Sequence, residues 1–188
     1  MKIEELGIAD CFLLEHNVYP DDRGIFREWF KAKELEAFVP GFSIQQANFS
    51  KSRKGVIRGI HYSLAPIGQA KLVTCTEGEI TDVLIDLRIG SPTYLKIQYS
   101  KLSEDSGKVI YIASGVGHGF VVEAEAASIV YLTSSVYSPE FEKSICPTDP
   151  ELGIKWPNSI ELGAIISPAD SSAPTLHQAK EAGNLPAY

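Results

Sequence analysis

Apolar and polar residues alternate with a period of two along most of the chain, and the alternating runs are short. This period predicts strands that bury one face. Turn residues separate the runs, as in Gly90-Ser91-Pro92. Many short strands with little helix indicate an all-β protein, an antiparallel sandwich or barrel of the jelly-roll kind. The predicted strands cover 12–19, 25–30, 43–52, 56–62, 71–76, 79–87, 93–102, 108–113, 120–122 and 127–133.

Two of the connections have the composition of hairpin turns. Glu77-Gly78 separates 71–76 from 79–87, and an acidic turn separates 120–122 from 127–133. Glycine in a short turn favours a tight connection between antiparallel neighbours. We therefore expect each of these two strand pairs to form a hairpin.

Helix is predicted in only two short segments. Residues 31–38 form a two-turn helix that Pro40-Gly41 ends. Residues 174–182 form another, with Pro174 at its first position and Gly183 just beyond its last. We expect one domain, 1–188, with a C-terminal loop and short helix, about 139–188, packed on the jelly roll.

Polar side chains occur inside the central strands, where a purely structural sheet has little need of them. Arg58 and His61 lie in 56–62, and strict alternation places them on opposite faces of that strand. A charged group and an imidazole in the interior of a sheet protein suggest a lined cavity. A structural explanation fits each residue equally well, with Arg58 paired to a surface acid and His61 hydrogen-bonded in the core.

Two aspartates in the next strand also have a structural explanation. Asp82 and Asp86 share a face of 79–87, and we expect them to pair with Arg58, Arg88 or Lys71.

Three glycines surround His118 in 114–120, and three flexible positions are unusual in a plain strand. We expect a sharp bend or a close approach to a ligand there. Tyr131, by contrast, lies among apolar β-forming residues, as a core tyrosine would.

The composition is that of a globular protein with an acidic balance. Apolar residues make up 44% of the chain, which is enough to form a core. The net charge of −7 argues against nucleic acid as the main partner. Cys11, Cys75 and Cys146 are too far apart for a disulfide framework or a paired-cysteine site. With no signal-peptide or membrane-spanning pattern, we expect a cytoplasmic protein.

A series of motifs follows in order along nearly the whole chain. They are Asp22-Arg23-Gly24-x-Phe26-x-Glu28, Gln46-x-Asn48-x-Ser50, Gly55-Val56-Ile57-Arg58-Gly59-Ile60-His61-Tyr62, Gln69-Ala70-Lys71-Leu72-Val73, Gly78-Glu79 to Asp82-Val83, Asp86-Leu87-Arg88-x-Gly90-Ser91-Pro92-Thr93, Gly117-His118-Gly119-Phe120 and Asp149-Pro150-x-Leu152-Gly153-Ile154-x-Trp156-Pro157. Each is weak alone, but as a set they are highly specific. Together they resemble the dTDP-4-dehydrorhamnose 3,5-epimerase family.

The resemblance implies a cupin-type jelly roll that is dimeric by strand exchange and needs no metal or organic cofactor. It implies conversion of dTDP-4-dehydro-6-deoxy-D-glucose to dTDP-4-dehydro-L-rhamnose, on the way to dTDP-L-rhamnose. The expected partners are the dTDP-sugar and a second copy of the chain in a homodimer, with neither nucleic acid nor membrane.

The resemblance also implies site residues, carried over by position. His61 would be the base, Asp170 the carboxylate that orients it, Tyr131 the acid on the opposite face and Lys71 the cation near the C4 oxygen. No metal ligand is expected. The substrate-binding positions, with Phe26 and Tyr137 near the nucleotide base, are Arg23, Phe26, Glu28, Gln46, Asn48, Arg58, His118 and Tyr137.

These residue types suit epimerisation beside a ketone. The reaction removes a proton to give an enolate and returns one to the other face, which a single base cannot do. Histidine, with an ordinary pKa of about 6.5, can accept a proton near neutral pH while a carboxylate fixes its tautomer. Tyrosine, with an ordinary pKa of about 10, stays protonated and can donate. Lys71 and Arg58 would stabilise the charge that develops on O4.

Other activities fit the same residues. Departures from the family pattern keep open a related nucleotide-sugar epimerase that inverts only C3 or only C5. A metal-dependent cupin would need two or three convergent histidines and a carboxylate. A sugar-binding module without catalysis is a further alternative. The departures are Ser63 after Tyr62, Leu132 after Tyr131, Ala169 before Asp170, and Ser114-Gly115-Val116.

Overall fold

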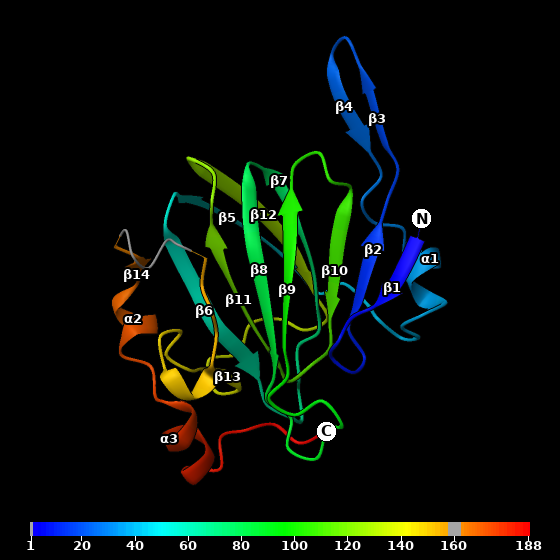
Figure 1. Cartoon of the computed structure of the whole chain (residues 1–188). Helices are drawn as coiled ribbons and strands as arrows, with labels where there is room; N and C mark the ends of the chain where they lie inside the picture. The colour runs from blue at the N-terminus through cyan, green and yellow to red at the C-terminus, as the bar shows by residue number, and fades with distance from the viewer. Residues whose placement is uncertain (1, 158–162) are drawn as a thin grey trace.

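The computed structural model describes residues 2–157 and 163–188. All of its strands except β3 and β4 belong to two mainly antiparallel sheets that face each other (Figure 1). The first sheet contains, in spatial order, β1 (Lys2–Glu5), β2 (Phe12–Glu15), β10 (Lys108–Ile112), β7 (Lys71–Glu77), β12 (Ala126–Thr133) and β5 (Gln46–Arg53). The second contains β13 (Glu142–Ser144), β6 (Val56–Ser63), β11 (Val116–Val122), β8 (Glu79–Asp86) and β9 (Ile97–Ser103), with β14 (Ile165–Ile166) parallel to β6. The predicted jelly roll is confirmed.

Both predicted hairpins are wrong. β7 and β8 follow each other in the chain but lie in different sheets, and so do β11 and β12. Each connection crosses from one sheet to the other, as it must when two sheets enclose one core. Gly78 has a φ of 72°, and a Cβ there would lie 2.0 Å from the carbonyl oxygen of Ala126. Glycine is therefore needed because the chain passes close to Ala126 at this crossing. The prediction failed because a turn motif indicates that the chain changes direction, but not which strand it pairs with.

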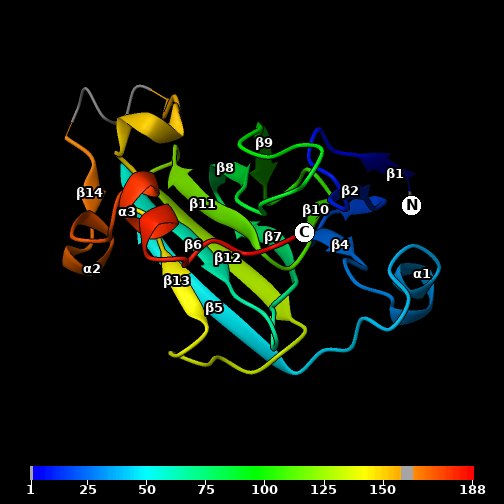
Figure 2. The ribbon, with the colours of Figure 1, turned by 90° about the horizontal axis from the view of Figure 1, so that it is seen from below.

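Apolar side chains fill two layers. Val73 of the first sheet and Leu84 of the second belong to the central core. Behind the second sheet, Ile60 packs with Trp156 and Leu176 of the C-terminal segment. Figure 2 shows α3 lying beside β6 on this side. The second sheet is therefore covered on both faces, which explains the almost continuous burial of β8 and β11.

The helices are short and peripheral. They are α1 (Ala32–Glu36), η1 (Pro150–Leu152), α2 (Pro168–Ser171) and α3 (Leu176–Glu181). Both predicted helices are present, but α3 begins later than expected because Thr175 and Gln178 form a capping box at its start. Residues 158–162 of the expected C-terminal packing segment lie outside the described residues. No helix in the described part of the chain is long and apolar enough to cross a membrane.

The predicted bend around His118 is wrong for most of that segment. Val116–Val122 is a buried strand, β11, and its glycines reflect close packing. A Cβ on either Gly117 or Gly119 would lie 2.7 Å from the side chain of Ile60. The small residues let β6 and β11 approach each other, which a local sequence pattern does not distinguish from flexibility.

A two-stranded hairpin projects from the body of the molecule (Figure 1). Its strands are β3 (Val18–Asp21) and β4 (Gly24–Arg27), so the predicted strand 12–19 is divided between β2 and β3. Phe26, on β4, leaves 63% of its surface exposed, and Tyr19 and Ile25 are also exposed. Exposed apolar residues on a projecting element are typical of a contact with another surface.

Candidate active site

Arg58 and His61 lie on the same side of β6, and the prediction of opposite faces is wrong. In β11, Phe120 pairs with Arg58 and His118 pairs with His61, with a register shift between these two pairs. β6 thus takes three residue steps where β11 takes two. Strict alternation fails at this bulge, which turns both side chains toward the first sheet.

His61 forms a close pair with Asp170. The Nε2 atom of His61 lies 2.7 Å from Oδ1 of Asp170, although the two residues are 109 positions apart. Ser167 caps α2 by accepting a hydrogen bond from the Asp170 backbone N–H, which fixes the helix that carries the carboxylate. Burial acts to raise the pKa of Asp170, but the hydrogen bond and charge of His61 outweigh it and hold that pKa below its ordinary value.

A second histidine and aspartate pair lies beside the first. Nε2 of His118 lies 2.7 Å from Oδ2 of Asp82, whose side chain has no exposed surface. The other carboxylate oxygen, Oδ1, is buried without a hydrogen-bond partner among the described residues. Asp82 was expected to pair with a cation of the sheet, and it orients His118 instead. Asp86 does pair with Arg88, as expected.

Lys71 and Tyr131 come from the first sheet and face the second. Lys71 pairs with Thr133, and Tyr131 pairs with Val73, so the register places both on one side of their sheet. Burial lowers the pKa of Lys71, and the negative charge of Glu142 opposes this effect. Burial, with Glu142, raises the pKa of Tyr131 above its ordinary value. Val73, which lies on the same side of the sheet, belongs to the central core, so Lys71 and Tyr131 face the space between the sheets.

Sequence reasoning missed Glu142. It lies in β13, beyond the point where the alternating pattern fades, and three residues are too few to give a periodic signal. Only the pairing of Glu142 with Ser63 of β6 brings it to the site.

Gln46, Asn48 and Tyr137 form a connected group at one edge of the first sheet. Nε2 of Gln46 donates to Oδ1 of Asn48 at 2.8 Å, and Oε1 of Gln46 accepts from the backbone N–H of Tyr137 at 2.9 Å. Asn48 pairs with Tyr131 across β5 and β12. Arg58 donates from Nε to the Ser52 hydroxyl at 3.0 Å. The structure therefore places Gln46, Asn48 and Tyr137 close to Tyr131.

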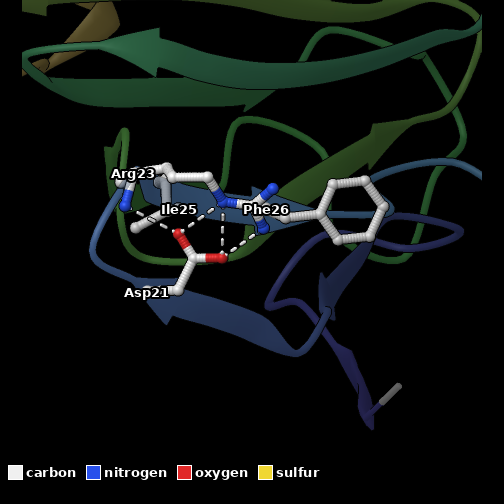
Figure 3. A pocket seen from close by; sticks show the side chains of 5 residues that line it. Asp21, Arg23, Ile25 and Phe26 are labelled. Atoms are coloured by element: carbon white, nitrogen blue, oxygen red, sulfur yellow. Dashed lines mark hydrogen bonds and ion pairs between the residues drawn. The ribbon is translucent and has the colours of Figure 1, made fainter.

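Arg23, Phe26 and Glu28 do not join that set within one chain. Arg23 and Phe26 belong to the projecting hairpin, and Figure 3 shows the Arg23 guanidinium held by the Asp21 carboxylate. The hairpin residues line an open hollow of about 270 Å³ together with Ile25. Glu28 forms an ion pair with Lys31 at 2.7 Å. The predicted binding residues thus fall into two groups, one on the body and one on the hairpin.

The titratable residues of 2–157 and 163–188 include no group of three His, Cys, Asp or Glu side chains that could hold a metal ion. His61 and His118 are instead each paired with a single aspartate. The metal-dependent cupin alternative therefore finds no ligand set within these residues.

Comparisons with known proteins identify the family of this chain. A family model described as dTDP-4-dehydrorhamnose 3,5-epimerase matches residues 5–178. This chain belongs to the dTDP-4-dehydrorhamnose 3,5-epimerase family. A 3-epimerase from Streptomyces niveus is 40% identical over 100% of this chain and 90% of its own length. A 3,5-epimerase from Mycolicibacterium smegmatis is 39% identical over 100% of this chain and 92% of its own length.

A solved structure has the same fold. The dTDP-6-deoxy-D-glucose-3,5-epimerase from Legionella pneumophila, in complex with dTDP-4-keto-L-rhamnose, gives a TM-score of 0.90 at 38% identity. The match covers 100% of this chain and 98% of that one. The family resemblance inferred from the motifs is confirmed, and the chain is an isomerase, an epimerase of this family. The relatives include enzymes named for inversion at C3 alone and enzymes named for inversion at both carbons.

Proposed function

We propose that this chain inverts C3 and C5 of dTDP-4-dehydro-6-deoxy-D-glucose to give dTDP-4-dehydro-L-rhamnose, in the biosynthesis of dTDP-L-rhamnose. The observation that carries the proposal is the contact between His61 of the second sheet and Asp170 of α2, with Tyr131 and Lys71 facing His61 from the first sheet. A sugar ring held between the sheets would present one face to the imidazole and the other to the phenol. That arrangement suits removal and return of a proton on opposite faces.

The chemistry follows from the groups present. His61 takes a proton from the carbon beside the C4 ketone and becomes an imidazolium, which the Asp170 carboxylate stabilises. The electron pair moves to O4, where the cations Lys71 and Arg58 stabilise the enolate. Tyr131 then returns a proton to the carbon from the opposite face. The ketone itself acidifies C3 and C5 in turn, so this sequence needs no further electron sink.

Proton NMR of the purified protein with the 4-keto-6-deoxy sugar nucleotide in heavy water tests this function. We expect deuterium to enter both C3 and C5 and the product to have the L-rhamno configuration. Exchange and inversion at C3 alone would identify the chain with the 3-epimerase relatives instead. Binding of the nucleotide sugar without exchange at either carbon would support a sugar-binding module and contradict catalysis.

Replacing Tyr131 by phenylalanine separates proton removal from inversion. We expect Tyr131→Phe to keep partial exchange at one carbon, because His61 is untouched, and to lose full inversion by roughly 10²-fold or more. The measurement is the ratio of deuterium entry to product formation in heavy water. Tyr94→Phe is the matched control, since Tyr94 lies on the half-exposed turn before β9. Normal inversion in Tyr131→Phe would contradict its role as the acid.

We also propose that the protein acts as a homodimer in which the hairpin of one protomer completes the site of its partner. The support is the separation of Arg23, Phe26 and Glu28 from His61 within one chain, together with the exposed apolar surface of the hairpin.

We propose a cytoplasmic location as well. The three cysteines, Cys11, Cys75 and Cys146, are free thiols and lie far apart in the chain. Free thiols are typical of proteins in a reducing compartment.

Mixed dimers test the exchange of the hairpin. An Arg23→Ala chain and a His61→Ala chain are each expected to be nearly inactive alone. Co-expressed, they should form mixed dimers in which one site has an intact hairpin and an intact His61, restoring roughly a quarter of the wild-type activity. Light scattering should give the mass of two chains. If the mixture stays as inactive as its parts while dimers form, the hairpin does not act in the partner's site.

A further inference from the structure

Glu142 lies on the side of β13 that faces the site. Ser144 pairs with His61, and Glu142 pairs with Ser63 two positions along β6. Residues two apart share a face, so the register turns Glu142 toward the same space as His61. Glu142 also lines a small recess together with Ser63 and Gln69, next to the start of β7. The side chain is half-buried.

Lys71 and Glu142 carry opposite charges, and neither forms an ion pair within the described residues. Lys71 has only 8% of its surface exposed, and no carboxylate in the described residues lies within 4.0 Å of its ammonium group. Glu142 makes no ion pair within that distance in the same part of the chain. Burying an ammonium ion without compensation costs several kcal/mol, so an opposite charge facing the same space is a strong local influence.

We propose that Glu142 is a positioning residue that keeps both Lys71 and Tyr131 protonated for the reaction. The inference rests on the proposed function, in which Lys71 stabilises the enolate as an ammonium ion and Tyr131 donates a proton. The negative charge of Glu142, at the edge of the site, stabilises the cation of Lys71 and destabilises a tyrosinate. Both effects hold the two groups in the states that the reaction uses.

The directions in which the pKa values of Lys71 and Tyr131 are displaced agree with this role. Burial lowers the pKa of Lys71, and Glu142 is the group that raises it again. Burial raises the pKa of Tyr131, Glu142 raises it further, and Arg58 acts in the opposite direction. Removing the charge of Glu142 should therefore lower the pKa of both groups. The ionisable groups that face this space are Arg58 and His61 of β6, His118 of β11 with Asp82 of β8 behind it, Lys71 of β7, Tyr131 of β12 and Asp170 of α2.

The pH dependence of Glu142→Gln tests the proposal. Loss of the carboxylate should move the alkaline limb of kcat/KM to lower pH, so that activity near pH 9 falls by roughly three- to tenfold relative to wild type. Glu142→Asp, which keeps the charge, should restore most of the profile. Glu140→Gln is the matched control, because Glu140 is an exposed acid two residues away in the same segment. An unchanged alkaline limb in Glu142→Gln would overturn the proposal.

A titration without substrate separates this inference from the proposed function. NMR of protein labelled with ¹³C at lysine Cε and tyrosine Cζ follows both protonation equilibria, with signals assigned from Lys71→Met and Tyr131→Phe. In Glu142→Gln, both transitions should occur at lower pH than in wild type, and in Glu140→Gln they should not move. Unmoved titrations contradict the role of Glu142 even if the enzyme is active. Shifted titrations in a protein that does not exchange the substrate's protons would contradict the proposed function alone.

Discussion

Replacing His61 by alanine lowers kcat/KM by roughly 10²- to 10⁴-fold, the range expected when a general base is removed. The His61 imidazole lies 2.7 Å from the Asp170 carboxylate, and its side chain is still half-exposed. His118 has a similar partner in Asp82 but is buried, so it cannot take over the role. The loss should appear in both exchange of the C3 and C5 protons and product formation.

His177→Ala is the matched control for this substitution. His177 lies in α3 with most of its side chain exposed, and it also contacts a carboxylate, that of Glu181 at 3.3 Å. Its replacement should leave kcat/KM within about twofold of wild type, because an exposed histidine pair contributes little. Circular dichroism and urea unfolding of His61→Ala check that the fold is intact. If His61→Ala exchanged protons at the wild-type rate, the assignment of the base would be wrong.

Replacing Arg88 by alanine destabilises the fold by about 3–5 kcal/mol, because it leaves a buried carboxylate without its cation. Asp86 has no exposed surface, and Arg88 donates to both of its oxygens at 2.9 Å. Arg88 also reaches Asp10 at 3.0 Å and lies 4.8 Å from the ring of Tyr188. The residue thus connects the second sheet to segments near both ends of the chain.

Urea unfolding measures this loss as a lower midpoint at an unchanged slope. Lys101→Ala is the control, since Lys101 forms an exposed ion pair with Glu123 whose loss should cost less than about 1 kcal/mol. Burial acts to raise the pKa of Asp86, but Arg88, Ser91 and Thr93 outweigh it and hold that pKa below its ordinary value. The stabilisation by Asp86 is therefore present at neutral pH and is lost as the pH falls through the lowered pKa. An Arg88→Ala chain as stable as Lys101→Ala would contradict the network.

The strands were predictable because short runs of apolar and β-branched residues, bounded by turn residues, mark them locally. Val56–Ser63, Lys71–Glu77 and Glu79–Asp86 match the predicted segments to within about two residues, the usual uncertainty at an element's ends. The pairing of strands was not predictable in this way. Glu77-Gly78 has the composition of a hairpin turn, but whether the chain pairs with itself or crosses to the second sheet is decided by the core that both sheets share.

The site shows the same division. The family resemblance paired His61 with Asp170 although no periodic pattern connects them, and the structure places them in contact. Strict alternation separated Arg58 from His61, because a bulge in β6 leaves no mark in the local pattern. Glu142 went unnoticed because its position follows from strand pairing alone. Local periodicity therefore predicts where strands occur. The arrangement of the site depends on how those strands pair, which the local sequence does not specify.

One NMR time course in heavy water tests most directly whether an imidazole and a phenol act on opposite faces of the sugar. Wild type, His61→Ala and Tyr131→Phe are each mixed with the 4-keto-6-deoxy sugar nucleotide, and loss of the C3 and C5 proton signals is followed beside formation of inverted product. We expect wild type to show both processes, His61→Ala to show neither, and Tyr131→Phe to lose proton signal without full inversion. Loss of proton signal in His61→Ala at the wild-type rate, or unimpaired inversion in Tyr131→Phe, would contradict this account.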